Sequence, residues 1–266
     1  MLKQRILTAL LLAPVVLAII YYGNGLVFSL FVSFLAMMIA YEWCQIVKNS
    51  PINSGIISIL VAIAIFTLQY ASFIEIDATR IVIAALLIWI ICLFWLFQPE
   101  SGKGKYSKKY ALGVAILLLF GASLTAIHAI PVIGVKLTFA LFFLVWIADV
   151  GAYVSGKNFG KHKLAPKVSP GKTIEGVIGA LLFTSIYGFF IALWLNQAWL
   201  PFVLVFPILT VISIIGDLFA SLLKRHGSIK DSGFLLPGHG GFLDRFDSLI
   251  AITPFYFAFV HYFVVS

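Results

Sequence analysis

Charged residues are scarce in this sequence. Asp, Glu, Lys and Arg make up only 11% of its 266 residues, and 62% are hydrophobic. A soluble domain usually carries about 25% charged residues, so no stretch of the chain is polar enough to form one. Cysteine is equally rare: Cys44 and Cys92 match no metal-binding or redox spacing. We therefore interpret both cysteines as small apolar residues in or near helices.

Long apolar runs dominate the chain instead. Runs of about 20 residues recur, and each is long enough to cross about 30 Å of hydrocarbon. Because backbone polar groups in lipid must be satisfied within the segment, such runs form helices. The sequence predicts an all-α, polytopic membrane protein with about nine transmembrane helices. We place the spans at Ile6–Tyr22, Leu26–Tyr41, Ile56–Ser72, Ile81–Phe97, Tyr110–His128, Lys136–Tyr153, Ile174–Leu195, Leu200–Leu223 and Leu249–Val265.

The basic residues predict an orientation. If the N-terminus is cytoplasmic, all but Arg80 and Lys136 of the 18 Lys and Arg residues fall on the inner side. Cytoplasmic loops are enriched in Lys and Arg, so this separation favours a cytoplasmic N-terminus. The net charge of +8 then faces the anionic inner leaflet. Because these residues are spread over several short loops, we expect no nucleic-acid partner.

We divide the chain into N-terminal transmembrane helices, residues 1–135, and a C-terminal transmembrane catalytic region, residues 136–266. The second part holds two cytoplasmic loops, 156–173 and 224–248, which mix Gly, Pro, His, Lys and Asp. Long loops of this kind are often functional. A third inner loop, Gln98–Lys109, is rich in Gly, Lys and Ser, and we expect it to be a solvated tether.

Acidic residues gather in one part of the chain. Of only ten, Asp217, Asp231, Asp244 and Asp247 fall within a single short segment. Charged groups in transmembrane helices are expensive and usually functional. The helical period places Asp217 on one face with Ser221 and Lys224.

Two of these acids predict a metal site. Asp244 and Asp247 are three residues apart, so at the start of a helix they share one face. Two such carboxylates repel each other unless a cation lies between them. Hard oxygen ligands suit Mg²⁺, which also bridges to substrate phosphates, and Asp217 is a candidate third ligand. The alternative is that both acids only stabilise the helix dipole.

Both loops also contain candidate phosphate-binding groups. Gly240 and Gly241 permit a tight backbone path whose N–H groups can approach phosphate oxygens. The other loop ends in Ser169-Pro-Gly-Lys-Thr173, but a P-loop is excluded because Pro166 stands where that motif needs glycine. We interpret it as a cationic phosphate clamp that leads into a helix N-terminus. The alternative is a solvated basic loop.

Two further acids flank the clamp. Asp149 lies near the inner end of the sixth predicted span, and Glu175 follows the clamp directly. We treat both as weaker site candidates that orient Lys172 or a second cation. Small residues such as Gly176 and Gly179 pack helices closely, and the sequence leaves open whether they do so within one chain or between subunits of a homo-oligomer.

The segment from Ser221 to Asp247 closely resembles the signature of the phosphatidate cytidylyltransferases, or CDP-diacylglycerol synthases. It contains, at the right spacing, S-x-x-K-R, then K-D, then P-G-H-G-G, and then D-R-x-D. Trp146–Tyr153 and Ser169–Gly176 resemble upstream motifs of that family. The resemblance is strong over residues 141–250, whereas the first 100 residues resemble the family mainly in hydropathy. At Gly171-Lys172 the chain departs from the two basic residues expected in many relatives.

The resemblance implies an enzyme that joins CTP and phosphatidate, with divalent metal, into CDP-diacylglycerol and pyrophosphate. A phosphate monoester is already an anionic nucleophile, so the enzyme needs cations to hold two polyanions together rather than a catalytic triad. We expect Mg²⁺ as cofactor, with a second divalent or monovalent cation left open, and a bacterial inner membrane with the site facing the cytoplasm. The candidate catalytic residues are Asp217, Lys224, Asp244 and Asp247, and the candidate phosphate-binding residues are Ser169, Lys172, Thr173, Arg225, Lys230, His239, Gly240, Gly241 and Arg245.

Three alternatives remain at this point. A CTP-using lipid kinase and a CDP-alcohol phosphotransferase are the nearest enzymes, but the latter's aspartates end in D-x-x-x-D whereas this chain has D-x-x-D. A transporter with a cation path through Asp149 and Asp217 is the rival from another class. Transporter sites usually lie at the bilayer midplane, whereas these charges cluster near one interface.

Overall fold

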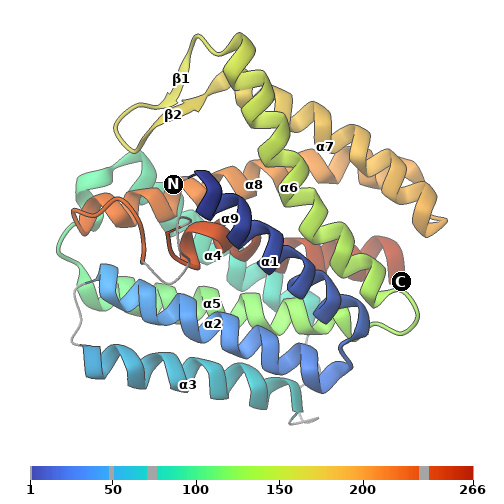
Figure 1. Cartoon of the computed structure of the whole chain (residues 1–266), viewed down its shortest axis with the longest axis horizontal. Helices are drawn as coiled ribbons and strands as arrows, with labels where there is room; N and C mark the ends of the chain where they lie inside the picture. The colour runs from blue at the N-terminus through green and yellow to red at the C-terminus, as the bar shows by residue number, and fades with distance from the viewer. Residues whose placement is uncertain (1, 48–50, 71–76, 234–239, 266) are drawn as a thin grey trace.

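The computed structural model describes residues 2–47, 51–70, 77–233 and 240–265 (Figure 1). Over this part of the chain the structure is helical except for one small hairpin. The elements are α1 Leu2–Tyr22, α2 Gly25–Ile46, α3 Pro51–Tyr70, α4 Ala78–Phe97, the 3-10 helix η1 Pro99–Gly102, α5 Tyr106–His128, α6 Gly134–Phe159, β1 Lys163–Ala165, β2 Ser169–Thr173, α7 Ile174–Leu195, α8 Trp199–His226, α9 Leu243–Val260 and a terminal π-helical turn, η2 His261–Val265.

The helices have the length and composition of membrane spans. Within the described residues, eight helices, α2 to α9, are long and apolar enough to cross a membrane, and α1 contributes the shorter apolar stretch Leu12–Tyr22. Large apolar side chains point outward along them, for example Leu87 on α4 and Ile186 on α7, as lipid-facing surface requires. The prediction of an all-α, polytopic membrane protein is confirmed; the orientation of the N-terminus stays a prediction.

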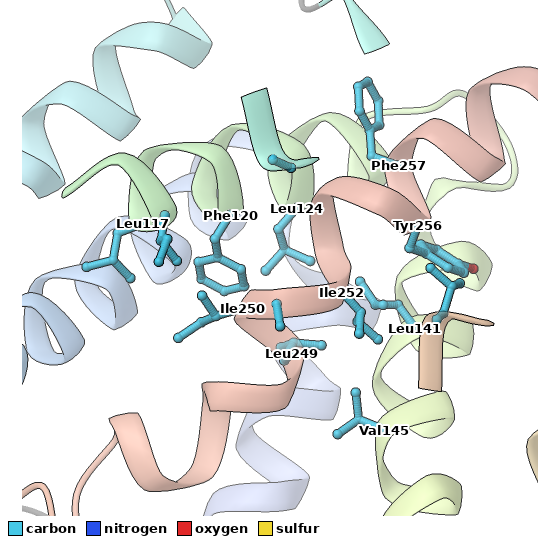
Figure 2. Packing of buried hydrophobic residues seen from close by; sticks show 14 of the residues in the cluster. Leu117, Phe120, Leu124, Leu141, Val145, Leu249, Ile250, Ile252, Tyr256 and Phe257 are labelled. Carbon is cyan, nitrogen blue, oxygen red and sulfur yellow. The ribbon is translucent and has the colours of Figure 1, made fainter. Parts of the chain in front are cut away.

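The C-terminal helices pack in sequence, α6 on α7, α7 on α8 and α8 on α9, while α2 packs on α3 and α5. α9 is the central element, since its buried face also meets α5 and α6. Figure 2 shows Leu249, Ile252 and Tyr256 of α9 between Phe120 of α5 and Leu141 of α6. This core fixes the helix that carries two of the candidate metal ligands.

Close approach of α6 and α7 depends on glycine. A Cβ on Gly179 would collide with Ser155 and the Gly151 carbonyl, and one on Gly176 would press on the Ala152 carbonyl. These small residues therefore pack two helices of the same chain, which resolves what the sequence left open about their role. Oligomeric state stays untested.

Both functional loops are shorter than predicted, because the helices around them extend further. α6 continues to Phe159 and α8 to His226. The segment between α6 and α7 forms an antiparallel hairpin in which Lys163 pairs with Thr173 and Ala165 with Ser169. In Figure 1 this hairpin projects from one corner of the bundle.

The expected solvated tether, Gln98–Lys109, is only partly right: residues 103–108 are exposed, but the segment is packed at two points. Lys109 lies in α5 and is buried, and its carbonyl accepts a hydrogen bond from the Trp43 indole at 3.0 Å. Gly102 is buried against Trp95 and His226. The connection is thus anchored at Gly102, where the lack of a side chain lets the backbone lie against Trp95 and His226, while the residues that follow are exposed to solvent.

Candidate active site

Two adjoining cavities lie where α6, α8, α9 and the hairpin meet. The more polar one, about 360 Å³, contains every described aspartate of the predicted site; it is lined by Val145, Asp149, Asp217, Lys224, Asp231, Asp244, Arg245, Asp247 and Ser248. The other, about 300 Å³, lies between α6, α7 and the hairpin and is mostly apolar, with Tyr153, Lys157 and Lys172 among its polar groups. Asp149, Asp217 and Ser248 line both cavities.

Asp217 and Asp247 reach the same cavity because α8 and α9 approach closely. A Cβ on Gly216 would meet the Cβ of Ala251 and the carbonyl oxygen of Asp247, so glycine here lets the two backbones pack against each other. Ser221 donates a hydrogen bond to Asp217 at 3.4 Å, which confirms the predicted shared face of α8 for these two residues. Asp244 and Asp247 line one cavity from the first turns of α9, as their spacing predicted.

The hairpin brings a cation to this cluster. The Nζ of Lys172, at the end of β2, lies 2.5 Å from Oδ2 of Asp217. Thr173 follows it as the N-cap of α7, with its hydroxyl accepting the Gly176 N–H at 3.1 Å. This N-cap fixes the residue at which β2 ends and α7 begins. Because Lys172 directly precedes the cap, its position is fixed as well.

Asp244 is held by three donors. Its Oδ1 lies 2.5 Å from Nζ of Lys224, and its Oδ2 accepts the backbone N–H groups of Ser232 at 2.8 Å and Gly241 at 3.2 Å. Gly240 has a φ of 82°, which glycine adopts readily. The Gly241 N–H that we predicted for phosphate is thus donated to a carboxylate of the same chain. His239 lies outside the described residues.

Some predicted residues lie elsewhere. Arg225 and Lys230 are exposed and line neither cavity, and Ser169 begins β2 beyond the lining residues. Glu175 does not orient Lys172; it accepts from His162 Nδ1 at 2.6 Å and from the backbone N–H of Lys161 at 3.1 Å. Glu175 closes the hairpin onto α7, because the first turn of a helix points its side chains back toward the preceding segment.

Three charged residues that line or support the site were not assigned from the sequence: Asp231, Lys157 and Glu42. Asp231 and Lys157 line the cavities. Glu42 is a buried acid on α2, 2% exposed, that contacts the start of α9. A signal for it was present, since Glu42 is the single charged residue of α2 and directly follows the second predicted span, and intramembrane charges are usually functional.

The cluster has the composition of a site for polyanions and metal. Within the described ranges, no three carboxylates, histidines or cysteines converge on one point to form a ready cage for an ion. Mg²⁺ does not require such a cage, because it is commonly held by one or two carboxylates, waters and substrate phosphates. Asp149, Asp217 and Asp247 supply oxygen ligands around the cavity, while Lys172, Lys224 and Arg245 supply positive charge. The residues present fit magnesium and a phosphorylated substrate.

Comparison with known proteins gives one consistent result. A family model described as "Cytidylyltransferase family" matches residues 3–263. The chain is 34% identical over 292 residues to a protein of Haemophilus influenzae named phosphatidate cytidylyltransferase, with 100% of both chains covered. Proteins of the same name from Pseudomonas aeruginosa and Bacillus subtilis are 37% and 31% identical, and the matches cover 97% and 95% of this chain and 96% and 95% of theirs.

Proposed function

Because this chain belongs to the cytidylyltransferase family, we propose that it transfers CMP from CTP to phosphatidate, giving CDP-diacylglycerol and pyrophosphate. The observation that carries the proposal is the convergence of carboxylates and basic side chains from α6, α8 and α9 on one cavity, where Lys172 of the hairpin pairs with Asp217. A site for two polyphosphate-like substrates needs that combination, and the relatives named for this reaction match along nearly the whole chain.

The proposed reaction needs no protein nucleophile. A non-bridging oxygen of the phosphatidate phosphate attacks the α-phosphorus of CTP, and a new P–O–P linkage forms. The bond from the α-phosphorus to the oxygen that bridges to the β-phosphorus breaks, and pyrophosphate leaves with the electron pair. The protein must align these groups and neutralise their charge, which is mostly positioning and electrostatic work.

Lys172 and Lys224 are the residues we assign to charge neutralisation. Each lies 2.5 Å from an aspartate, Asp217 and Asp244 respectively. Each lysine is therefore balanced while no substrate is bound, which limits the electrostatic cost of keeping charge within the membrane-spanning part of the protein. Incoming phosphates compete with these carboxylates for the lysines, and the exposed Arg245 at the same cavity adds a third cation.

Mg²⁺ is part of the proposal. Asp217, Asp247 and Asp149 are the residues we expect to hold it, whereas Asp244 is occupied by its three donors. When bound, the ion supplies positive charge at the transferring phosphoryl group. Asp149 thus moves from a weaker candidate to a leading one, because it lines both cavities.

The substrates also suggest where in the cell the protein lies and which side of the membrane its site faces. We propose a bacterial inner-membrane protein with the site on the cytoplasmic side, where water-soluble CTP and leaflet-bound phosphatidate meet. The asymmetry of Lys and Arg supports this side. The cavities lie among α6, α7, α8 and α9, which are long and apolar enough to cross a membrane, and this supports a lipid substrate.

Product analysis of the purified protein tests the function. It is incubated with CTP, Mg²⁺ and ³²P-labelled phosphatidate in detergent micelles, and the lipid and soluble products are separated. We expect labelled CDP-diacylglycerol and an equal amount of pyrophosphate. A phosphorylated lipid with CDP would instead indicate a lipid kinase, and release of CMP from added CDP-diacylglycerol and an alcohol would indicate a phosphotransferase. Ion flux in proteoliposomes without nucleotide turnover would indicate a transporter.

A further inference from the structure

Glu42 is a buried carboxylate that the proposed reaction does not use. It lies on α2, far from the C-terminal segment in sequence, and only 2% of it is exposed. Nevertheless its side chain is directed at the residues that begin α9. Its Oε1 accepts the Phe242 N–H at 2.9 Å, and its Oε2 accepts the Leu243 N–H at 2.9 Å. Both are N–H groups that an α-helix start leaves without a partner in its own helix.

A second set of bonds joins Glu42 to the cavity. Ser232 donates its hydroxyl to Glu42 Oε2 at 2.8 Å and its backbone N–H to Asp244 Oδ2 at 2.8 Å. One residue of the α8–α9 connection is thus held from both sides, by Glu42 from the buried side and by Asp244 from the cavity side. The contact is close, because a Cβ on Gly233 or Gly241 would collide with the Glu42 carboxylate.

We propose that Glu42 is a positioning residue of the active site, which fixes where α9 begins and so sets Asp244 and Asp247 relative to Asp217. Asp244 lies one residue after Leu243, and Asp247 lies one turn further, so a shift of the Glu42-bound residues displaces both carboxylates. Misplacement of a reacting group by about 1 Å lowers rate by roughly a hundredfold. The inference rests on the proposed cytidylyltransferase function for its kinetic readout.

The arrangement requires a carboxylate. Each oxygen of Glu42 accepts one backbone N–H, and the Ser232 hydroxyl bonds to one of them. Glutamine has the same shape but only one acceptor oxygen. Whichever way the amide turns, its NH₂ faces a backbone N–H, so either Phe242 or Leu243 is left without an acceptor in a buried place. Glu42→Gln therefore disturbs the start of α9 without creating a cavity.

The test compares Glu42→Gln with Tyr256→Phe. The Tyr256 hydroxyl donates to the Leu137 carbonyl at 3.0 Å, so this control also removes a buried hydrogen bond from α9, but three turns beyond the carboxylates. We measure kcat, the KM for phosphatidate, the Mg²⁺ concentration that gives half-maximal rate, and thermal unfolding with and without Mg²⁺. In Glu42→Gln we expect kcat to fall roughly tenfold to a hundredfold, the required Mg²⁺ to rise several-fold and any Mg²⁺-induced rise in Tm to shrink. The KM for phosphatidate stays near the parental value. In Tyr256→Phe we expect a lower Tm, because a buried hydrogen bond is lost, but a parental kcat and a parental Mg²⁺ requirement.

A purely structural Glu42 gives a different pattern. Glu42→Gln would then lower Tm as Tyr256→Phe does, with parental kcat per folded molecule and a parental Mg²⁺ requirement, and that result overturns the proposal. If Glu42→Gln does not fold, Ser232→Ala tests the proposal instead. This variant removes one of the three donors to Glu42 and leaves both backbone hydrogen bonds to Glu42 in place. A smaller loss of kcat with the same shift in Mg²⁺ requirement supports the proposal, and parental kinetics overturn it. A parent protein that makes no CDP-lipid refutes the proposed function instead, and the Mg²⁺-dependent change in Tm still tests Glu42.

Discussion

Asp217 and Asp244 have the same side chain in different surroundings. The side chain of Asp217 is 31% exposed and contacts Lys172 and Ser221, whereas that of Asp244 is 6% exposed and bound by three donors. An exposed carboxylate is available to a ligand, while a buried one with filled acceptor sites mainly holds structure. Replacement of the two aspartates should therefore have different effects on activity and on stability.

Asn at each position separates these roles. We expect Asp217→Asn to lower kcat by roughly a hundredfold or more with little change in stability, because its ion pair is partly exposed. Asp244→Asn leaves Lys224 without its charge partner at a site where the lysine side chain is 13% exposed, so it should also destabilise the fold, on the order of 3–5 kcal/mol. Turnover and detergent-based thermal unfolding measure both. Equal stability losses would contradict the distinction.

Lys172 has a matched control on its own hairpin. We expect Lys172→Gln to raise the KM for CTP roughly tenfold or more, since a hydrogen bond to a charged group contributes about 1.5–3 kcal/mol. Lys167 has the same charge but is exposed and lines neither cavity, so Lys167→Gln should leave the KM near the parental value. Initial rates over a range of CTP concentrations decide it. Similar changes in both variants would show that only the loop's net charge matters.

The contact of α8 with α9 depends on one glycine, and its enlargement should lower activity. In Gly216→Ala the new methyl group meets Ala251 and the Asp247 carbonyl, so the helices must separate near both aspartates. We expect a loss on the order of 1–3 kcal/mol in stability and a clear drop in kcat. Gly55→Ala on α3, where a Cβ meets no other atom within 4 Å, is the control and should keep parental values. Full activity of Gly216→Ala would show that the reaction does not depend on the distance between Asp217 and Asp247.

The helices and the acid pairs could be predicted because their signals are local. Apolar runs of spanning length, the D-x-x-D spacing and the shared face of Asp217 and Ser221 each depend on residues within one helix. The hairpin could not be predicted in this way, since β1 has three residues and the segment shows no alternation of apolar and polar side chains. Glu175 was misassigned for the same reason: its partner His162 becomes its neighbour only when the hairpin forms.

Glu42 and Asp244 show a second limit. The partners of Glu42 are 190 to 201 positions away, and helical periodicity says nothing about which helices meet. The donors to Asp244 include two backbone N–H groups, and any residue type other than proline can supply those. The sequence motifs therefore predicted which residues form the candidate site, but not the contacts that hold those residues in place.

The topology of the whole bundle predicts which side of the membrane each loop faces. With Cys44 and Cys92 replaced by alanine, we introduce a single cysteine at Val132, which is 97% exposed between α5 and α6, or at Lys163, which is exposed on the hairpin. With a cytoplasmic N-terminus, a membrane-impermeant maleimide added to spheroplasts should label Val132→Cys. Lys163→Cys should react only after the membrane is opened. The reverse pattern would contradict the predicted orientation.

The reach from Glu42 to the start of α9 also has a consequence for how the protein is made. A ribosome delivers α2 early and the residues near Leu243 about 200 positions later, and domains and segments generally fold in the order of their synthesis. Until α9 enters the membrane and meets α2, Glu42 lacks its two backbone donors, Phe242 and Leu243, and Asp217 has neither Asp244 nor Asp247 beside it. With the proposed site, we therefore expect the nascent chain to have no activity through most of translation, until α9 inserts.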